Sequence, residues 1–273
     1  MKTQAMDTVN TVQISALPAF DSNYLWLIHN SASAWVVDPG DAAVVQAALD
    51  EKNLTLKGIL VTHHHADHVG GVLALKKRYP QARVIGPKKE NVAGLDQDAV
   101  DGARYTLDGL GFDAQCMAVP GHTAGHVAYY LAACPELGGI PRLFCGDTLF
   151  AAGCGRLFEG TPAQMLASLA QITALPGATL AYCAHEYTQS NLVFAASADP
   201  DNEAVHARLA QCMALRDAGV ATVPFVLGQE LHSNPFLRCH TAGVRAAVSA
   251  QSGQVLSDTL AVFTALRAWK NVF

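Results

Sequence analysis

This sequence has few charged residues. Lys, Arg, Asp and Glu make up 15% of its 273 residues, and 18 basic against 23 acidic side chains leave a formal net charge of −5. A chain of this kind has no broad basic field for holding nucleic acid, although a local basic pocket can still bind an anion. We therefore expect no nucleic-acid partner.

Long apolar runs are also missing. Nowhere do about 18 apolar residues follow one another, as a membrane-spanning helix would require. Lys2 is followed by no continuous apolar stretch before Asp7 and Asn10, so we expect no secretory signal. These two observations predict a cytoplasmic protein that does not act at a membrane.

The cysteines show no disulfide or metal-binding pattern. Their number is odd, they are widely scattered, and no C-x-x-C pair occurs. We interpret them as reduced residues of the core and not as catalytic thiols. A G-x-S-x-G elbow is absent too, so no covalent nucleophile is expected. The seven cysteines are Cys116, Cys134, Cys145, Cys154, Cys183, Cys212 and Cys239.

Hydrophobic residues are plentiful, at 51%, and predict a compact globular protein of one or two domains. Short apolar runs bounded by turns predict strands, and intervening helical patterns indicate a layered α/β domain. The expected strands are 24–28, 34–37, 58–62, 83–85, 114–119, 127–131, 143–145 and 179–183. Helices are expected over 42–51 and 69–79, and after the capping box that begins at Thr161.

The pattern changes after residue 185. Four helices are predicted there, with no convincing strand between them. We therefore place a domain boundary near this point and expect a larger domain over 1–185 and a smaller helical domain over 186–273. The four helices are 189–198, 203–218, 241–250 and 257–271.

Six consecutive residues carry a dense set of possible metal ligands. His63, His65, Asp67 and His68 follow the apolar run 58–62 in H-x-H-x-D-H spacing. Imidazole and carboxylate groups suit zinc, iron or manganese. This spacing is too tight for all four side chains to face one ion without strain, so it indicates two neighbouring ions.

Three more donors follow predicted strands elsewhere in the chain. They are His122 in a Gly-His-Thr sequence, Asp147 in Gly-Asp-Thr, and His185 in His-Glu-Tyr. Taken alone, each histidine could be a hydrogen-bonded structural residue and the aspartate a turn or helix cap. The edge of an α/β sheet beyond its strand ends is nevertheless where sites of this fold class form.

The order of these motifs resembles the metallo-β-lactamase superfamily, and within it most closely the glyoxalase II (hydroxyacylglutathione hydrolase) family. Further marks of the resemblance are Gly146–Gly160, Asn234–Arg238 and Leu266–Asn271, so it extends to the C-terminus. It implies an α/β fold, a four-layer αββα sandwich followed by a smaller all-helical domain.

The resemblance also implies a ligand set. His63, His65 and His122 would hold one divalent ion and Asp67, His68 and His185 the other, with Asp147 bridging them. Zinc is the first choice, with iron or manganese as alternatives. A hydroxide bridging the two ions would be the nucleophile, with Asp67 and Asp147 as the catalytic carboxylates.

Three other residues of these motifs have no ligand role on this comparison. His64 and His126 match histidines that are not ligands. Asp38 either lies near the site or forms an ordinary turn. Asp67 has a second candidate role as a general acid or base, which ranks below its role as a ligand.

The implied reaction converts S-D-lactoylglutathione and water to D-lactate and glutathione, downstream of a glyoxalase I type isomerase that acts on methylglyoxal. Arg156, Tyr187, Arg267 and Lys270 match substrate-binding positions. Phe158 stands where many relatives have tyrosine, so one hydroxyl contact would be lost. The alternative for Arg267 and Lys270 is a solvated cationic helix end.

Two other functions remain open at this point. The same metal site could act on another thioester, a lactone or a phosphodiester, because a fold does not define a substrate. A non-catalytic metal-binding interaction module is an alternative of another class, although such descendants normally lose ligands. A monomer is the working expectation, and no sequence feature bears on it.

Overall fold

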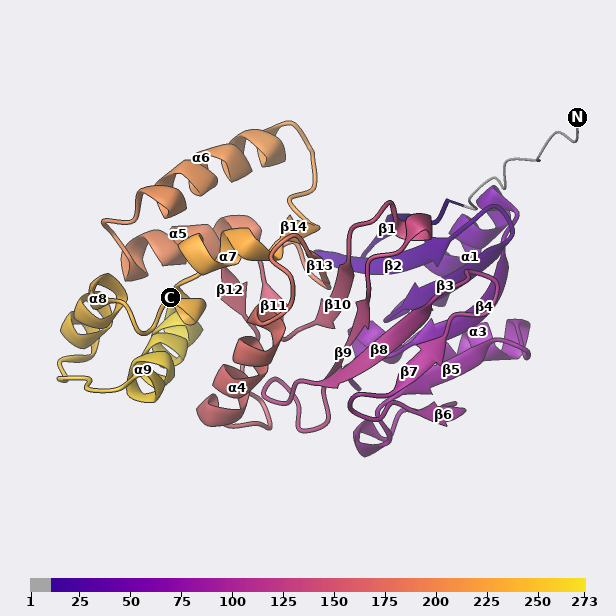
Figure 1. Cartoon of the computed structure of the whole chain (residues 1–273), viewed down its shortest axis with the longest axis horizontal. Coiled ribbons are helices and arrows are strands. Elements are labelled where there is room, and N and C mark those ends of the chain that lie inside the picture. The colour runs from indigo at the N-terminus through magenta and orange to yellow at the C-terminus, as the bar shows by residue number, and fades with distance from the viewer. Residues whose placement is uncertain (1–10) are drawn as a thin grey trace, which may run out of the picture.

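The computed structural model describes residues 11–273 and consists of two six-stranded sheets with helices on their outer sides (Figure 1). The expectation about a secretory signal falls on residues 1–10, outside the described residues. The first sheet and its helices lie at one end of the molecule, and helices α5 to α9 gather at the other (Figure 1).

The first sheet has the strand order β1-β2-β3-β4-β5-β6. Successive side chains of a strand point to opposite faces. In β2, Trp26 and Ile28 therefore face the second sheet, whereas Leu25 and Leu27 pack under the outer helices. The strands are β1 (Gln13–Ala19), β2 (Asn23–His29), β3 (Ser33–Val37), β4 (Thr55–Leu60), β5 (Arg83–Gly86) and β6 (Gln97–Asp98). The helices in this half are α1 (Ala42–Lys52), α2 (Ala66–Val69), α3 (Val72–Arg78) and η1 (Lys88–Glu90).

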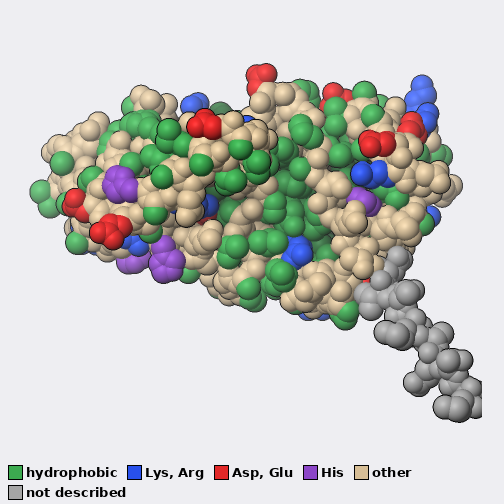
Figure 2. Space-filling view, turned by 90° about the horizontal axis from the view of Figure 1, so that it is seen from above, with side chains coloured by type: hydrophobic (Ala, Val, Ile, Leu, Met, Phe, Trp, Pro, Cys, Tyr) green, Lys and Arg blue, Asp and Glu red, His purple; other side chains and the backbone are tan. Residues whose placement is uncertain are grey.

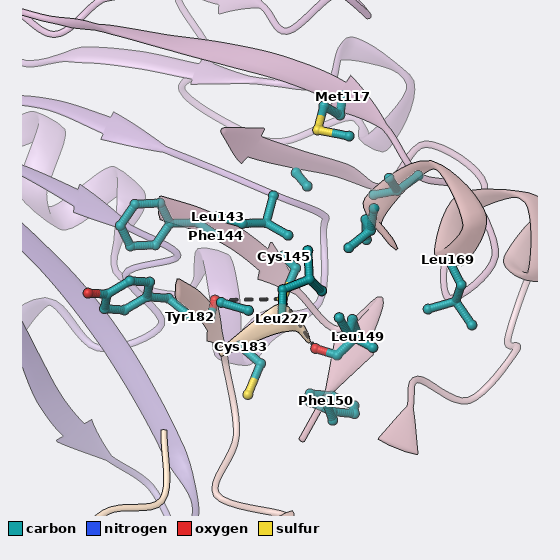
Figure 3. Packing of buried hydrophobic residues seen from close by; sticks show 14 of the residues in the cluster. Met117, Leu143, Phe144, Cys145, Leu149, Phe150, Leu169, Tyr182, Cys183 and Leu227 are labelled. Carbon is teal, nitrogen blue, oxygen red and sulfur yellow. Dashed lines mark hydrogen bonds between the residues drawn. The ribbon is translucent and has the colours of Figure 1, made fainter. Parts of the chain in front are cut away.

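The second sheet has the order β14-β13-β10-β9-β8-β7. Its strands are β7 (Arg104–Thr106), β8 (Asp113–Ala118), β9 (Val127–Leu131), β10 (Arg142–Gly146), β13 (Leu180–Cys183) and β14 (Phe225–Val226). Between β8 and β14 lie η2 (Pro135–Leu137) and a small hairpin of β11 (Leu149–Phe150) and β12 (Gly153–Cys154). Leu143 and Cys145 of β10 pack with Leu227 from beyond β14 in one core (Figure 3).

Helices cover the outer side of this sheet. In α4, Met165, Leu169 and Ile172 are buried in the core of the second sheet, so the layers run helix, sheet, sheet, helix. The predicted αββα sandwich is confirmed. The predicted capping box is confirmed as well, because Thr161 accepts a hydrogen bond from the backbone of Gln164. The helices of this part are α4 (Pro162–Thr173), α5 (Thr188–Ala198), α6 (Glu203–Asp217), α7 (Leu227–Ser233), η3 (Pro235–Leu237), α8 (Ala242–Ser252) and α9 (Thr259–Val272).

Two predictions about individual elements are wrong. The single helix over 69–79 is interrupted at Gly70 and Gly71, which lie against the backbone of Pro39 and Gly40 so closely that a Cβ would not fit. A strand also exists after residue 185. β14 pairs antiparallel with β13 but has only two residues, too few for a period to appear.

Other sequence expectations can be compared with the described residues. All seven cysteines are free, and six of them are buried. In the part described, 11–273, no helix combines the length and apolar character needed to cross a membrane. On the face in Figure 2, Lys and Arg side chains are scattered singly among other types.

Candidate metal centre and substrate cleft

Four chain segments meet at one end of the two sheets, and each follows a strand. His63 to His68 come after β4, His122 after β8, Asp147 after β10 and His185 after β13. The seven predicted metal ligands fall into overlapping groups of three residues. Within each group, the donor atoms lie within 4.8 Å of one another. Residues spread over more than 120 positions are thus brought together by the fold.

The first group is made of three histidines. Nδ1 of His65 lies 3.1 Å from Nε2 of His63 and 3.0 Å from Nε2 of His122. Burial lowers the pKa of all three imidazoles, most strongly that of His63. Neutral imidazoles carry a free lone pair, so three lone pairs can be directed at one cation.

The second group combines Asp67, His68 and His185. Oδ2 of Asp67 lies 3.5 Å from Nε2 of His68 and 3.5 Å from Nε2 of His185. Asn23 donates a hydrogen bond of 2.9 Å to the same oxygen and so fixes the carboxylate. Although burial raises the pKa of Asp67, His68 and Asn23 bring it below its ordinary value, which keeps the group ionised at neutral pH.

Asp147 lies between the two groups. Its Oδ1 is 3.5 Å from Nε2 of His68, and its Oδ2 is 3.5 Å from Nε2 of both His122 and His185. Burial raises its pKa, but His68, His185 and His122 hold it well below the usual range. A buried carboxylate in this place can contact ions in both groups.

Two buried atoms show that this donor set fits divalent metal ions. Nε2 of His68 and Oδ1 of Asp147 have no hydrogen-bond partner, although buried polar atoms are normally satisfied. The two atoms lie 3.5 Å from each other. Histidine nitrogens with carboxylate oxygens are a donor set typical of zinc, iron or manganese.

Hydrogen bonds at the opposite ring nitrogen orient the histidines. Nδ1 of His122 donates to the carbonyl of Arg156 at 2.8 Å, and Nδ1 of His185 lies 3.1 Å from Oγ of Ser22. In each case the Nε2 atom is left to face the site. Such contacts fix the tautomer of a metal-binding histidine.

Asp38 has more than a turn role. Its Oδ2 accepts a 3.0 Å hydrogen bond from Nδ1 of His68 and a 2.7 Å bond from Oγ1 of Thr62. Burial lowers the pKa of His68, yet the carboxylates of Asp147, Asp38 and Asp67 together raise it to about 9. Of the two roles considered for Asp38, the structure places it beside the site, behind His68.

His126 and His64, for which the sequence predicts no ligand role, lie beside the predicted ligands. The backbone N–H of Asp147 donates to Nε2 of His126 at 3.1 Å, and the His126 ring stacks on His63 with ring centroids 4.6 Å apart. His64 instead turns away and hydrogen-bonds Glu90. Both therefore support neighbouring ligands.

A cleft of about 480 Å³ opens beside the predicted ligands His122 and Asp147. Its walls contain the five residues predicted to bind substrate, namely Arg156, Phe158, Tyr187, Arg267 and Lys270. A larger groove of about 680 Å³ between α8 and α9 has Asp258 as the one ionisable side chain in its described lining. Only the smaller cleft combines cations with the ligand cluster.

Two aromatic rings border the ligand groups. The Phe158 side chain is 63% exposed, and its ring meets His65 and His122 edge-on with centroid distances of 5.5 and 5.3 Å. Tyr187 stacks on His185, with centroids 4.6 Å apart and planes only 2° from parallel. Each group of ligands thus has one ring at its border with the cleft.

The two cations of α9 differ in their surroundings. Arg267 is 5% exposed and donates from Nη1 to the carbonyl of Cys154 at 2.8 Å, so it is not part of a solvated helix end. Nζ of Lys270 lies over the rings of Phe194 and Phe273, at 5.1 and 5.5 Å from their centroids. Burial, with help from two arginines, lowers the pKa of Lys270 to about 8.

Comparison with known proteins decides the family. Residues 19–185 match the model of the metallo-beta-lactamase superfamily, and residues 186–273 match that of the hydroxyacylglutathione hydrolase C-terminus. The hydroxyacylglutathione hydrolase of Dechloromonas aromatica is 51% identical over 96% of this chain and all of its own. The hydroxyacylglutathione hydrolase of Photobacterium profundum is 48% identical over 95% of this chain and 99% of its own.

The chain belongs to the hydroxyacylglutathione hydrolase family. It is therefore a metal-dependent hydrolase, and its metal ions are divalent. Solved structures support the fold. ETHE1 from Myxococcus xanthus is 23% identical, with a TM-score of 0.61 over 96% of this chain and 98% of its own. A metallo-beta-lactamase from Staphylococcus aureus is 17% identical, with a TM-score of 0.62 over 96% of this chain and 72% of its own.

Sequence reasoning missed several residues that support the site of this family member. Ser22 contacts His185 and Asn23 contacts Asp67, but nothing in the spacing of these residues along the chain connects them. Glu90 lies in the charged segment Lys88–Glu90, which is typical of an exposed surface. Its burial became visible only in the fold.

Proposed function

We propose that this hydroxyacylglutathione hydrolase converts S-D-lactoylglutathione and water to D-lactate and glutathione. One observation carries the proposal. The His and Asp cluster borders the same cleft in which Arg156 and Lys270 present positive charge. A substrate with a thioester at one end and carboxylates at the other needs that combination.

We assign the ligands as the family resemblance implies. His63, His65 and His122 would hold one ion and Asp67, His68 and His185 the other. The position of Asp147 between the two groups supports a bridging role. Zinc is the ion we favour, because histidine nitrogens and carboxylate oxygens are donors typical of its sites.

Bound divalent ions polarise a substrate carbonyl and lower the pKa of water enough to make hydroxide available near neutral pH. Around them, the chain's own residues orient the reaction. Asp67 is a carboxylate at neutral pH and about half-buried, so it is also placed to accept a proton from the attacking water. The products balance because water adds OH to the acyl carbon and H to the leaving sulfur.

Substrate binding is assigned to the walls of the cleft beside the ligands. Arg156 is exposed there and Lys270 is half-buried, so both can pair with carboxylates of glutathione. Tyr187, stacked on His185, offers a hydroxyl near the thioester. Phe158 offers only an apolar ring edge, which suits the acyl group or the sulfur better than a polar contact.

Arg267 has a different part in this proposal. Its guanidinium is committed to Cys154 of β12, so it connects α9 to the hairpin that precedes Arg156. We assign the helical domain over 186–273 to substrate binding, since it contributes Tyr187 and Lys270. We further propose a monomer in the cytoplasm that receives its substrate from a glyoxalase I type isomerase.

The direct test follows the absorbance of S-D-lactoylglutathione on adding purified enzyme, with metal content measured on the same sample. We expect the thioester signal to fall and about two ions per chain. The variant Asp147→Asn should lose at least about a thousandfold in kcat, since transition-state charge stabilisation is commonly worth several kcal/mol.

Asp113→Asn, an exposed carboxylate of β8, is the matched control and should behave like the wild type. Folded, metal-loaded enzyme that leaves the thioester intact would refute the proposal. If the enzyme hydrolyses other acyl thioesters but not S-D-lactoylglutathione, the reaction type is right and only the proposed substrate is wrong.

A further inference from the structure

Glu90 is a buried carboxylate that has no part in the proposed reaction. It ends the short helix η1 after β5, and its side chain is only 1% exposed. No Lys or Arg contact with it is found among the described residues. A carboxylate buried in this way is costly unless hydrogen bonds satisfy its oxygens.

Four donors surround the two oxygens of Glu90. Oε2 accepts from the backbone N–H of His64 at 3.0 Å and is also hydrogen-bonded to Nδ1 of the same residue. Oε1 accepts from Oγ1 of Thr123 at 2.9 Å and from the backbone N–H of Gly125 at 2.6 Å. Each oxygen therefore holds a different loop.

These two loops are the ones that carry the first ligand group. His64 lies between His63 and His65, and Thr123 directly follows His122. The loops are joined in three further ways, namely the approach of the three imidazoles at 3.0 and 3.1 Å, the stacking of His126 on His63, and a 3.0 Å hydrogen bond from the backbone N–H of Val127 to the carbonyl of Thr62. Glu90 adds a contact between the loops that runs through His64, Thr123 and Gly125 and not through the three predicted ligands themselves.

The contact with Gly125 requires a residue without a side chain. A Cβ there would lie 2.5 Å from Oε1 of Glu90 and 2.9 Å from Cβ of Lys89. The glycine lets the loop backbone approach the carboxylate closely. The glycine at position 125 and the buried carboxylate of Glu90 are therefore sterically matched.

We propose that Glu90 is a positioning residue for the ion held by His63, His65 and His122. By holding the two loops together through His64, Thr123 and Gly125, its carboxylate helps to set the distance between the three ligand nitrogens. The inference rests on the ligand assignment in the proposed function. It assigns no such role to Glu90 at the Asp67, His68 and His185 group, which it does not contact.

The test is Glu90→Gln, which keeps the shape of the side chain. Glutamine has one accepting oxygen and one NH₂ donor. Thr123 and the His64 ring can change roles to accept from that NH₂, but the backbone N–H groups of His64 and Gly125 cannot. Either orientation of the amide therefore leaves one loop facing a donor instead of an acceptor.

The measurement is competition for Zn²⁺ between the protein and a chelator, which resolves the two binding steps. We expect the dissociation constant of one ion to rise about 10–100-fold, as is typical when the partner of a ligand is removed. The dissociation constant of the other ion should stay within about threefold of its wild-type value. At a chelator concentration that leaves the wild type with two ions, the variant should keep about one, and excess Zn²⁺ should restore kcat.

Asp199→Asn is the matched control, since Asp199 is a buried carboxylate in the helical part that binds Asn202 and Arg238. It should lower the melting temperature and leave both zinc affinities unchanged. Thr123→Val, which removes one donor and leaves the carboxylate in place, should give a smaller loss at the same ion. It serves as the test variant if Glu90→Gln does not fold.

Unchanged zinc affinities in the variant, or equal losses at both ions, would overturn the inference. The ligand assignment has its own check, because His65→Ala should abolish one zinc step. If His65→Ala keeps both steps, the proposed function is wrong at this site. If it loses one step while Glu90→Gln loses none, only the role of Glu90 is wrong.

Discussion

At the scale of single residues, the protonation states of this hydrolase follow from burial. The histidines of the first group are neutral because burial disfavours their charged form, whereas His68 is charged in the absence of metal because three carboxylates surround it. A buried imidazole beside a carboxylate and one beside other imidazoles thus have opposite shifts. Lys270 resembles the histidines of the first group, because desolvation is the main cause that lowers its pKa.

The pKa of Lys270 predicts a pH dependence of substrate binding. Its folded-state pKa, about 8, lies below the ordinary value, so the ammonium is present below pH 8 and is lost as the pH rises through it. We expect KM for an anionic glutathione thioester to rise several-fold between pH 7 and 9. Lys270→Met should have a raised KM already at pH 7 and a flatter profile.

Steady-state kinetics at fixed ionic strength checks this prediction. Lys77→Met, an exposed lysine of α3, is the control and should keep the wild-type profile. A KM that is independent of pH in the wild type, or a Lys270→Met profile as steep as that of the wild type, would contradict it.

At the scale of elements, the site is made of loops that follow strands, and the helices hold these loops in place. Helix α4 follows the Arg156 loop, and Ser168 on it donates to the carbonyl of Pro120 at 2.7 Å, next to the His122 loop. The capping box at its start satisfies N–H groups that no helical carbonyl reaches. Neither Thr161 nor Gln164 lines the cleft, so the stability that the capping box gives to α4 can be separated from catalysis.

We expect Thr161→Ala to lower the free energy of unfolding by about 1 kcal/mol, the usual effect of losing an N-cap. For a chain of this size, that loss lowers the melting temperature by about 2–4 °C. Thr173→Ala, at the end of the same helix, should lower the free energy of unfolding by only a few tenths as much as Thr161→Ala does.

Calorimetry measures the stability of the two threonine variants, and the thioester assay measures their activity. The value of kcat/KM should be that of the wild type in both variants, because neither threonine lines the cleft. An N-cap variant that melts normally but has lost activity would refute the separation of α4 stability from catalysis.

At the scale of the whole molecule, residues before and after 185 share one core. Phe225, Phe263 and Leu266 belong to the same buried cluster as Phe144 and Leu169 of the sandwich. β14 also extends the second sheet through its pairing with β13. The two proposed domains therefore depend on each other for apolar burial.

Removal of residues 186–273 should for this reason prevent stable folding of the remainder. It would expose the edge of β13 and the core side chains that α9 covers. We expect the 1–185 fragment to show no cooperative melting by circular dichroism. Co-expression with the 186–273 fragment should restore it, and a sharp melting transition of the first fragment alone would disprove the dependence.

Metal removal should also lower the stability of the whole molecule. Ions that bind only the folded state stabilise it by about 4 kcal/mol at a thousandfold excess over their dissociation constant. A chelator should therefore lower the melting temperature by several degrees, and zinc should restore it. Asp147→Asn should respond less to the chelator, and an equal response in both proteins would contradict the bridging role.

The eight strands predicted from apolar runs are all present, because buried strands reveal themselves by local composition. β1 (Gln13–Ala19) was not predicted, since its alternation is broken by Pro18 and by half-buried residues. β6 and β14 have two residues each, which is too short for any period. The helix break at Gly70 depends on close contact with Gly40, a contact between distant parts of the chain.

For the site, the sequence by itself determined the types of donor and their place after strands. His63, Asp67, His122, Asp147 and His185 were recognisable because the chemistry of metal binding limits the residues that can perform it. What only the tertiary structure decided was which distant groups support them. The buried contact of Glu90 with two loops and that of Arg267 with Cys154, 113 residues away, could not be predicted. Local spacing carries no information about such contacts, since they arise only when separate segments pack together.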